Sequence, residues 1–296
     1  MRFSLLALAA AAAVASSAFA APPQPESAGA QRLAAMQAAL APRLAAAPTP
    51  RPLLIESSEQ AAVARGDIYA VLPHPYATLV AALREPAQWC EAFELHLYVR
   101  GCSAGPPGLT LQVVTRHDAP ADGAHALALA FSREVEGSGY VRTQLRAARG
   151  PLGTRDYEIV FEAVPAGPSA SFVHFGYQAG ASMMGQWALQ AYLATRGRDK
   201  VGFSAAPGDD RPGTIRGTRG VVERNAMRYE LAIEAYLDSL ALPEPARRAH
   251  RLAAWFDATE RYPRQLHEVE RADYLAAKSR AAAPAIGAAA GDRLPP

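Results

Sequence analysis

The chain has 296 residues, half of them hydrophobic, and a formal net charge of +2 at pH 7. So small a charge offers no general attraction for nucleic acid or for an anionic membrane surface, and neither is expected as a main partner. The length suits one elaborated domain, with an adequate core in which alanine is abundant.

The first twenty residues have the form of a secretory signal peptide. Arg2 supplies the positive start, residues 5–14 are almost unbroken apolar sequence, and Ala18-Phe19-Ala20 is a small-x-small cleavage site. An apolar core of about 10–15 residues is shorter than the ~20 that span a bilayer, which favours cleavage after Ala20 over an uncleaved anchor. No later segment is long and apolar enough to cross a membrane, so we expect a mature protein in the periplasm or secreted.

Composition divides the remainder of the chain. Residues 21–50 are rich in alanine and proline and are predicted to hold one short helix over 31–46. Residues 281–296 carry almost no large side chains, so we expect this tail to be disordered. A single domain is therefore predicted over 51–280, with 241–280 as its helical C-terminal extension.

The most informative order of elements comes early in this domain. An apolar run at 68–72 predicts a strand, and residues 79–83 place apolar side chains at helical spacing. Trp89 and Phe93 anchor a second short helix, and the alternating residues of 95–99 predict the next strand.

This order, with Pro86 at the break before Trp89, resembles the opening of domains in the START-like (helix-grip, SRPBCC-type) superfamily. The resemblance covers about residues 66–240. It implies an α+β fold in which a curved antiparallel sheet surrounds a long helix and leaves a cavity for a hydrophobic ligand. Such domains usually finish with one long helix over the cavity, whereas this chain continues with extra helices.

The middle of the domain is predicted to be an antiparallel sheet, because apolar and polar residues alternate there with the period of a strand that has one wet face. Residues 150–154 contain one proline and two glycines and predict a hairpin turn. The predicted strands are 109–113, 127–131, 141–145, 157–161 and 170–177.

The last third is predicted to be mainly helical, with one further strand at 200–205 and a polar loop at 207–220. The longest helix shows apolar residues in steps of three or four, which is typical of a helix with one buried face. The predicted helices are 182–195, 221–240, 245–260 and 264–278.

The two cysteines, Cys90 and Cys102, are expected to form a disulfide, because an exported chain meets an oxidising environment. Such a bridge would join the second short helix to the following strand and contribute roughly 3 kcal/mol on the chain-entropy model. The alternative is a catalytic thiol. A lone reactive cysteine does not need a partner twelve residues away, which favours the bridge.

Familiar catalytic and cofactor motifs are missing from the sequence. The seven histidines form no HExxH pattern and no close set with cysteine, and His267-Glu268 lacks the second histidine of a zinc helix. Neither Ser182 nor Ser204 lies in a G-x-S-x-G elbow, and no glycine-rich phosphate loop is present. We therefore expect no metal, no cofactor and no assignable catalytic residue.

Charged residues crowd the segments 195–203 and 217–229 on either side of the polar loop. One interpretation is a polar cluster at the cavity, where a guanidinium orients a carboxylate or phosphate head group. The other is ordinary capping and surface ion pairing, with Glu223 in the first turn of a helix. Arg228 is the most interesting member because it directly precedes Tyr229 on the apolar stripe.

Three further residues could contact a ligand. His174 lies beside Phe172 on an apolar strand, where it could bind a hydroxyl or act as a general base, or simply be satisfied by a backbone group. Met183 and Trp187 could line a lipid cavity or belong to an ordinary core.

The sequence thus predicts a periplasmic protein that binds or carries a hydrophobic or amphipathic, lipid-like small molecule, with transient membrane contact left open. Two alternatives remain: an enzyme of the same fold, of the cyclase or hydrolase type, and a structural or partner-binding envelope protein. The candidate ligand-binding residues are Phe172, His174, Met183, Trp187, Arg228 and Tyr229.

Overall fold

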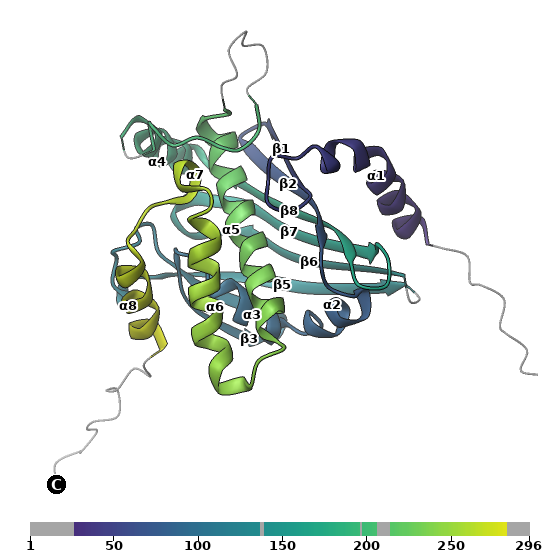
Figure 1. Ribbon diagram of the computed structural model, residues 1–296. Coiled ribbons are helices and arrows are strands. Elements are labelled where there is room, and N and C mark those ends of the chain that lie inside the picture. The colour runs from purple at the N-terminus through teal and green to yellow at the C-terminus, as the bar shows by residue number, and fades with distance from the viewer. Residues whose placement is uncertain (1–26, 137–138, 196, 206–213, 283–296) are drawn as a thin grey trace, which may run out of the picture.

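The computed structural model describes residues 27–136, 139–195, 197–205 and 214–282 (Figure 1). The expected signal peptide and residues 283–296 of the expected disordered tail lie outside the described residues. The first two residues of that tail, 281 and 282, are helical.

One antiparallel sheet of eight strands forms the centre of the structure, with the strand order β1-β2-β8-β7-β6-β5-β4-β3. The first hairpin therefore pairs with the last strand, and the remaining strands follow as a meander. The strands are β1 (Leu53–Gln60), β2 (Val63–Leu72), β3 (Val99–Gly105), β4 (Gly108–Val113), β5 (His125–Glu136), β6 (Tyr140–Arg149), β7 (Thr154–Pro165) and β8 (Ser171–Ala181).

The predicted hairpin at 150–154 is confirmed. It joins β6 to β7 through a short turn, Pro151–Gly153, and places Leu145 opposite Ile159 in the ladder. Leu152 and Gly153 both adopt positive φ, of 56° and 76°, which reverses the chain within a few residues.

Helices cover both faces of the sheet (Figure 1). The long helix α5 packs against β2, β1 and β8 on one face, with α6 behind it, while α1 lies on the opposite face. The helices are α1 (Ala28–Ala45), α2 (Tyr76–Ala82), α3 (Pro86–Phe93), α4 (Met183–Ala194), α5 (Gly217–Ser239), α6 (Glu244–Thr259), α7 (Pro263–Leu266) and α8 (Arg271–Ala282).

Helix α5 is the gripping helix of this fold. It begins four residues before the predicted 221–240 and is buried on nearly all sides. The expected apolar stripe packs on the sheet, with Val222 and Ala226 next to Gly66 of β2. Its other side is covered by α6, whose Trp255 donates an indole hydrogen bond to the carbonyl of Arg228 at 2.9 Å.

Helix α1 covers a second, smaller core. Ser27 caps its first turn by accepting a hydrogen bond from the amide of Ala30 at 3.0 Å. Leu33 and Leu40 are buried against Val164 and Phe172 of the sheet. The sheet is consequently buried on both faces where α1 lies.

Several sequence-based expectations are wrong at the level of local structure. Residues 95–98 form turns and the strand begins only at Val99. The side chains of Leu95 and Leu97 are buried, as in a strand, but the backbone at these residues pairs with no neighbouring strand. Residues 200–205 make a single bridge, Ala205 to Thr214, in place of a strand. The helix expected at 264–278 is divided into α7 and α8, and β1 was missed because only its first residues are apolar.

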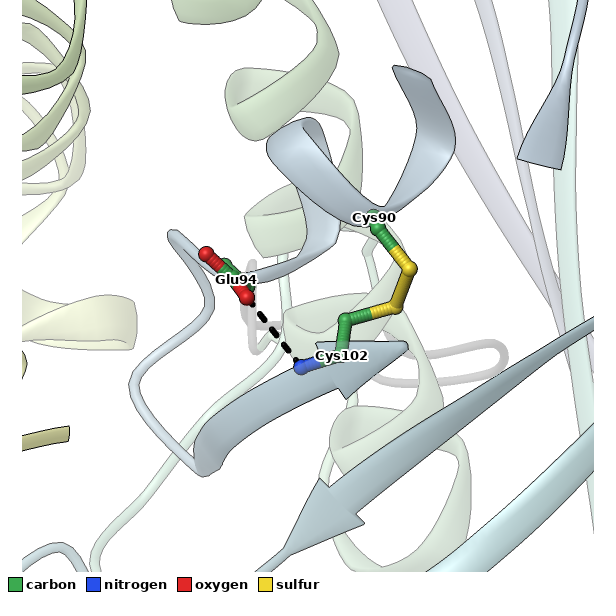
Figure 2. Close-up of a disulfide and its surroundings, with 3 residues drawn as sticks. All are labelled: Cys90, Glu94 and Cys102. Carbon is green, nitrogen blue, oxygen red and sulfur yellow. Dashed lines mark hydrogen bonds between the residues drawn. A yellow bond between two sulfur atoms is a disulfide. The ribbon is translucent and has the colours of Figure 1, made fainter. Parts of the chain in front are cut away.

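The disulfide between Cys90 and Cys102 is confirmed. It joins α3 to β3, with the two Cα atoms 5.2 Å apart (Figure 2). Glu94, just beyond the end of α3, accepts a hydrogen bond from the backbone amide of Cys102 at 3.1 Å. The covalent bond and the hydrogen bond therefore fix the same short helix to the sheet.

Candidate functional site

A cavity of about 260 Å³ lies between α5 and the sheet, close to the lower end of the size of small-molecule sites. We call it the main cavity. Its wall combines aromatic rings, aliphatic side chains and buried charged groups. The lining residues are His96, Tyr98, Val99, Val113, Val114, Thr115, His125, Pro151, Leu152, Thr154, Tyr157, Tyr177, Tyr192, Val221, Arg224, Asn225, Arg228, Tyr229 and Glu268.

A second hollow of about 220 Å³, here called the side cavity, adjoins it along α4. Tyr157, Tyr177, Val221 and Asn225 are among the residues that line both. Helix α4 contributes Gln186, among others, to the side cavity. The hollow space therefore extends from beneath the middle of α5 towards α4.

His96 lies in the wall of the main cavity, where a ring contact and a backbone hydrogen bond fix its side chain. It lies in the turn after α3, and its ring stacks on Tyr229 with the centroids 4.4 Å apart. Its Nδ1 accepts a hydrogen bond from the backbone amide of Tyr98 at 3.2 Å, so the proton of a neutral ring resides on Nε2. Burial lowers the pKa of His96 well below its ordinary value, and the charges of Arg228 and Lys278 lower it further. The imidazole is therefore neutral, with an N–H at Nε2.

Arg228, Glu268 and Tyr98 form a buried polar group beside this histidine. Arg228 Nη2 donates to Glu268 Oε1 at 2.6 Å, and the Tyr98 hydroxyl donates to the other carboxylate oxygen. Burial opposes ionisation of Glu268, but Arg228, Tyr98 and Lys200 together outweigh it, and the pKa of this carboxyl is lowered. Glu268 is thus an anion whose two oxygens are both engaged.

Arg224 is a second buried guanidinium in the wall, one helical turn before Arg228. Its side chain donates to the carbonyl of Val201 at 3.2 Å, and the residue is only 2% exposed. Burial lowers the pKa of Arg224, and the charge of Arg228 acts in the same direction. In the part of the chain that the structure describes, no carboxylate lies within ion-pair distance of Arg224.

Aromatic rings pack around Tyr229. Tyr177 stacks on Tyr229 at 5.7 Å, and Phe93 packs against it at 4.8 Å. Burial raises the pKa of Tyr177 and of Tyr229, so both phenols remain neutral. Flat rings and neutral hydroxyl groups suit a ligand with an aromatic or otherwise planar body.

The structure brings two of the six candidate ligand-binding residues to the main cavity, Arg228 and Tyr229. Phe172 and His174 lie on the opposite face of the sheet, because β8 alternates and Phe175 and Tyr177 take the inward positions. Their expected position at the cavity is corrected accordingly.

Met183 and Trp187 lie on α4 and are 76% and 75% exposed. Neither lines the main or the side cavity, so the interpretation of these two residues as cavity lining or core is also corrected. Together with Leu152 they are large apolar side chains that the described structure leaves at the surface.

His174 is satisfied by charged groups beneath α1. Its Nε2 lies 2.7 Å from Asp67 Oδ1 and its Nδ1 lies 2.8 Å from Glu162 Oε2. Burial opposes protonation, but the hydrogen bonds to both carboxylates raise the pKa of His174. The same bonds lower the pKa of Asp67, and with Tyr140 they bring that of Glu162 to about 2, against its own burial. These bonds join β2, β7 and β8 to one another at the α1 side of the sheet.

Three residues of the cavity wall, His96, Tyr98 and Glu268, were not expected from the sequence as site residues. The concentration of charged residues at 217–229 did indicate the arginines of the site. Arg224 and Arg228 lie in the wall of the cavity, as the interpretation of a polar cluster at the cavity predicts. His96 lies in a turn and Glu268 comes from the chain after α7, so no spacing connects them. Among the described residues, no group of histidine, cysteine and carboxylate side chains is placed to hold a metal ion.

Within the same described residues, no helix combines the length and the apolar character needed to cross a bilayer. No family model and no curated protein matches the sequence.

Several solved structures are similar to this chain. A START superfamily protein from Mycobacterium smegmatis is 16% identical, with a TM-score of 0.30, over 40% of this chain and 78% of its own. Ara h 8.0201 is 12% identical, with a TM-score of 0.35, over 60% of this chain and 99% of its own. The Zhui aromatase/cyclase from a Streptomyces species is 10% identical, with a TM-score of 0.32, over 70% of this chain and 99% of its own.

The fold is identified by the arrangement of its strands and helices. One curved antiparallel sheet, a long helix packed on its inner face and a pair of short helices between the second and third strands are the parts that define it. This chain has the START-like, helix-grip fold that the sequence resemblance predicted.

Proposed function

We propose that this chain is an exported binding protein that holds a small amphipathic molecule in the main cavity and releases it unchanged. The observation that carries the proposal is the hollow between α5 and the sheet, whose wall joins aromatic rings to buried polar groups. A space of this kind removes an apolar body from water and still provides polar partners that fix its orientation. The part of the proposal that concerns export rests on the N-terminal sequence, which has the form of a signal peptide.

The chemistry of the wall favours binding over catalysis. A general base needs a free lone pair, whereas the lone pair of His96 at Nδ1 is used by the amide of Tyr98. Glu268 is the acid that lies beside Arg228, but both of its oxygens already accept hydrogen bonds. His174, the base that the sequence suggested, is bound to Asp67 and Glu162 beneath α1 and does not reach the cavity.

The alternative of a partner-binding protein with a collapsed interior has less support. It requires a filled core and an exposed apolar patch on the helices at 245–278. The described structure instead has a cavity, and its exposed large apolar side chains are those of Val135, Leu152, Met183 and Trp187.

The test is native mass spectrometry of the protein exported to a bacterial periplasm, before and after extraction with organic solvent. Val221 lines both cavities, so Val221→Trp should fill them. Val135→Trp is the matched control, because Val135 is 44% exposed on β5. We expect an extractable adduct on the wild type and on the control, and none on Val221→Trp. Bare protein from several hosts, together with no binding of added aromatic or lipid-like probes, would overturn the proposal.

A further inference from the structure

Helix α4 has an outer face without charge. The helix lies at the edge of the molecule, near the N-terminal end of α5 (Figure 1), and none of its twelve residues has a charged side chain. A helix of this composition is normally buried in a core or in a membrane, because it offers water no charged face. Among the residues whose side chains the structure describes, those exposed on α4 are Met183, Gln186, Trp187, Gln190, Ala191 and Ala194, which share one side of the helix.

Leu152 adds an exposed apolar side chain next to the start of α4. The amide of Ser182, which caps α4, donates to the carbonyl of Gly153 at 2.7 Å. Leu152 is 55% exposed and has a φ of 56°, in the left-handed region that glycine and asparagine tolerate best. This conformation strains a leucine, and the side chain gains little burial in return. We call Leu152 and the outer face of α4 the apolar patch.

The inner side of α4 lines the hollow spaces of the protein. Leu189 lines the side cavity and Tyr192 the main cavity. A third hollow of about 590 Å³, here called the outer hollow, adjoins the main cavity, and Thr115 and Tyr192 line both. Thr115 and Thr195 are exposed at the rim of the outer hollow, so it opens to the surface beside the end of α4. The apolar patch therefore lies next to the entrance of the main cavity.

Unpaired positive charges lie near both ends of α4. Arg149 is exposed at the base of the hairpin that carries Leu152. Arg216 is exposed near the other end, where its guanidinium donates to the carbonyl of Arg198 at 3.1 Å. In the part of the chain that the structure describes, no carboxylate lies within ion-pair distance of Arg149 or Arg216.

The acidic residues of the same region leave a local positive surplus. Asp156 and Asp199 pair with the adjacent arginines, Arg155 and Arg198. Glu59, exposed at the side cavity, has no basic partner within ion-pair distance among the described residues. One unpaired acid thus stands against two unpaired arginines. The net charge of the whole chain is small, so this surplus is a property of the surface around α4 and favours an anionic partner there.

We propose that the apolar patch docks this protein on the anionic surface of a phospholipid bilayer, with Leu152, Met183 and Trp187 among the head groups and Arg149 and Arg216 facing anionic lipids. Tryptophan is favoured at the boundary between head groups and acyl chains. Buried apolar area and attraction to anionic lipids are the two sources of affinity for such a surface. The outer hollow then opens at the bilayer. The inference goes beyond the proposed function, because docking is tested without any ligand.

The first test measures co-sedimentation of the exported protein with vesicles of phosphatidylcholine alone and of phosphatidylcholine mixed with phosphatidylglycerol. We expect about tenfold tighter binding to the mixed vesicles at low salt, as for two arginines near an anionic surface, and a smaller difference at high salt. Met183→Gln combined with Trp187→Gln should weaken binding to the mixed vesicles about 10- to 100-fold. Val135→Gln is the matched control, because Val135 is exposed at the opposite end of β6 from the hairpin, and it should bind as the wild type does.

The second test separates the leucine and the charges. Asparagine tolerates the left-handed conformation, so Leu152→Asn should leave the melting temperature unchanged or raise it and still weaken vesicle binding about tenfold. Arg149→Gln combined with Arg216→Gln should remove the preference for the mixed vesicles and leave binding to phosphatidylcholine unchanged. Arg84→Gln is its control, because Arg84 is exposed between α2 and α3.

The outcomes separate docking from the proposed function. If the wild type binds neither kind of vesicle, or if the variant with both Met183→Gln and Trp187→Gln binds as tightly as the wild type, the docking inference is wrong. A wild-type dimer that this variant converts to monomers, together with no vesicle binding, would mean that the apolar patch joins two copies of the chain instead. Protein that binds vesicles but never carries an adduct or a probe would overturn the proposed function and leave the docking inference intact. Thermal melting establishes that each variant folds, and the two vesicle compositions test the wild type even where one does not.

Discussion

Gly66 of β2 lies directly against the backbone of Val222 on α5: a methyl group on Gly66 would be 3.0 Å from the carbonyl oxygen of Val222. Strand and helix approach this closely because glycine has no side chain there. The contact is next to Val221, which lines both cavities, so the position of the wall depends on it.

Gly66→Ala should therefore displace α5 by a few tenths of an ångström and lower the free energy of unfolding by about 1–3 kcal/mol. Chemical denaturation measures the change. Gly101→Ala is the control, because a methyl group there meets only Gln112 at 3.9 Å, an ordinary contact. Equal stability of the two variants would contradict the close approach of strand and helix.

His174→Gln should destabilise the protein in a pH-dependent way, by about 3 kcal/mol at most, because it removes the cation that bridges Asp67 and Glu162. The raised pKa of His174 gives stability that is complete below about 6.5, its unfolded value, and is lost as pH rises through the folded pKa. The lowered pKa of Glu162 gives stability that is complete above about 4.5 and is lost as pH falls towards 2.

The difference in free energy of unfolding between wild type and His174→Gln should accordingly be largest between about pH 4.5 and 6.5. Urea denaturation at a series of pH values measures it. His250→Gln, at an exposed position of α6, should show no such maximum. A difference that stays constant with pH would mean that His174 is not charged between its two partners.

Reduction of the disulfide should lower the free energy of unfolding by roughly 3 kcal/mol, since the closed loop between Cys90 and Cys102 is short. Melting in the presence and absence of a reductant measures the effect. The double variant Cys90→Ala, Cys102→Ala should melt at the same temperature in both conditions. Ligand binding at saturating concentration should survive, because neither cysteine lines the main cavity.

Trp187 should dominate the quenchable fluorescence of the protein. It is 75% exposed, whereas Trp89 is fully buried and Trp255 is 2% exposed, and these are the three tryptophans of the chain. Acrylamide should quench the wild type strongly and Trp187→Phe weakly, with stability changed by less than about 0.5 kcal/mol. Weak quenching of the wild type would place Trp187 in a buried environment after all.

The sequence predicted the sheet well where one face of a strand is wet. β4, β5, β6 and β7 alternate apolar and polar side chains, and they appear close to their expected positions. β8 is different, because the core beneath α5 buries one of its faces and α1 and its neighbours bury the other. With both faces buried, alternation no longer tells which side chains point inward. This is why His174 could be expected at the cavity and yet lies beneath α1.

The candidate site was only partly predictable for a related reason. Arg228 and Tyr229 share a helix with a clear apolar stripe, so their neighbourhood could be read from spacing. His96 and Glu268 come from irregular segments, and only the packing of the helices in the C-terminal part brings Glu268 to Arg228. The pairing of Arg228 with Glu268 depends on side-chain orientation, which no one-dimensional pattern contains.

The strand order has a consequence for how the chain assembles. β3 to β8 pair with their neighbours in sequence and can form step by step, but β2 pairs with β8, so that Val63 lies opposite Gly180. The β1–β2 hairpin can join the sheet only after β8 has formed, and β8 ends more than a hundred residues later in the chain. Until residue 181 has emerged and folded, the edge of this hairpin has no partner and α5 has no complete surface to grip, so closure of the cavity is a late, long-range event in folding.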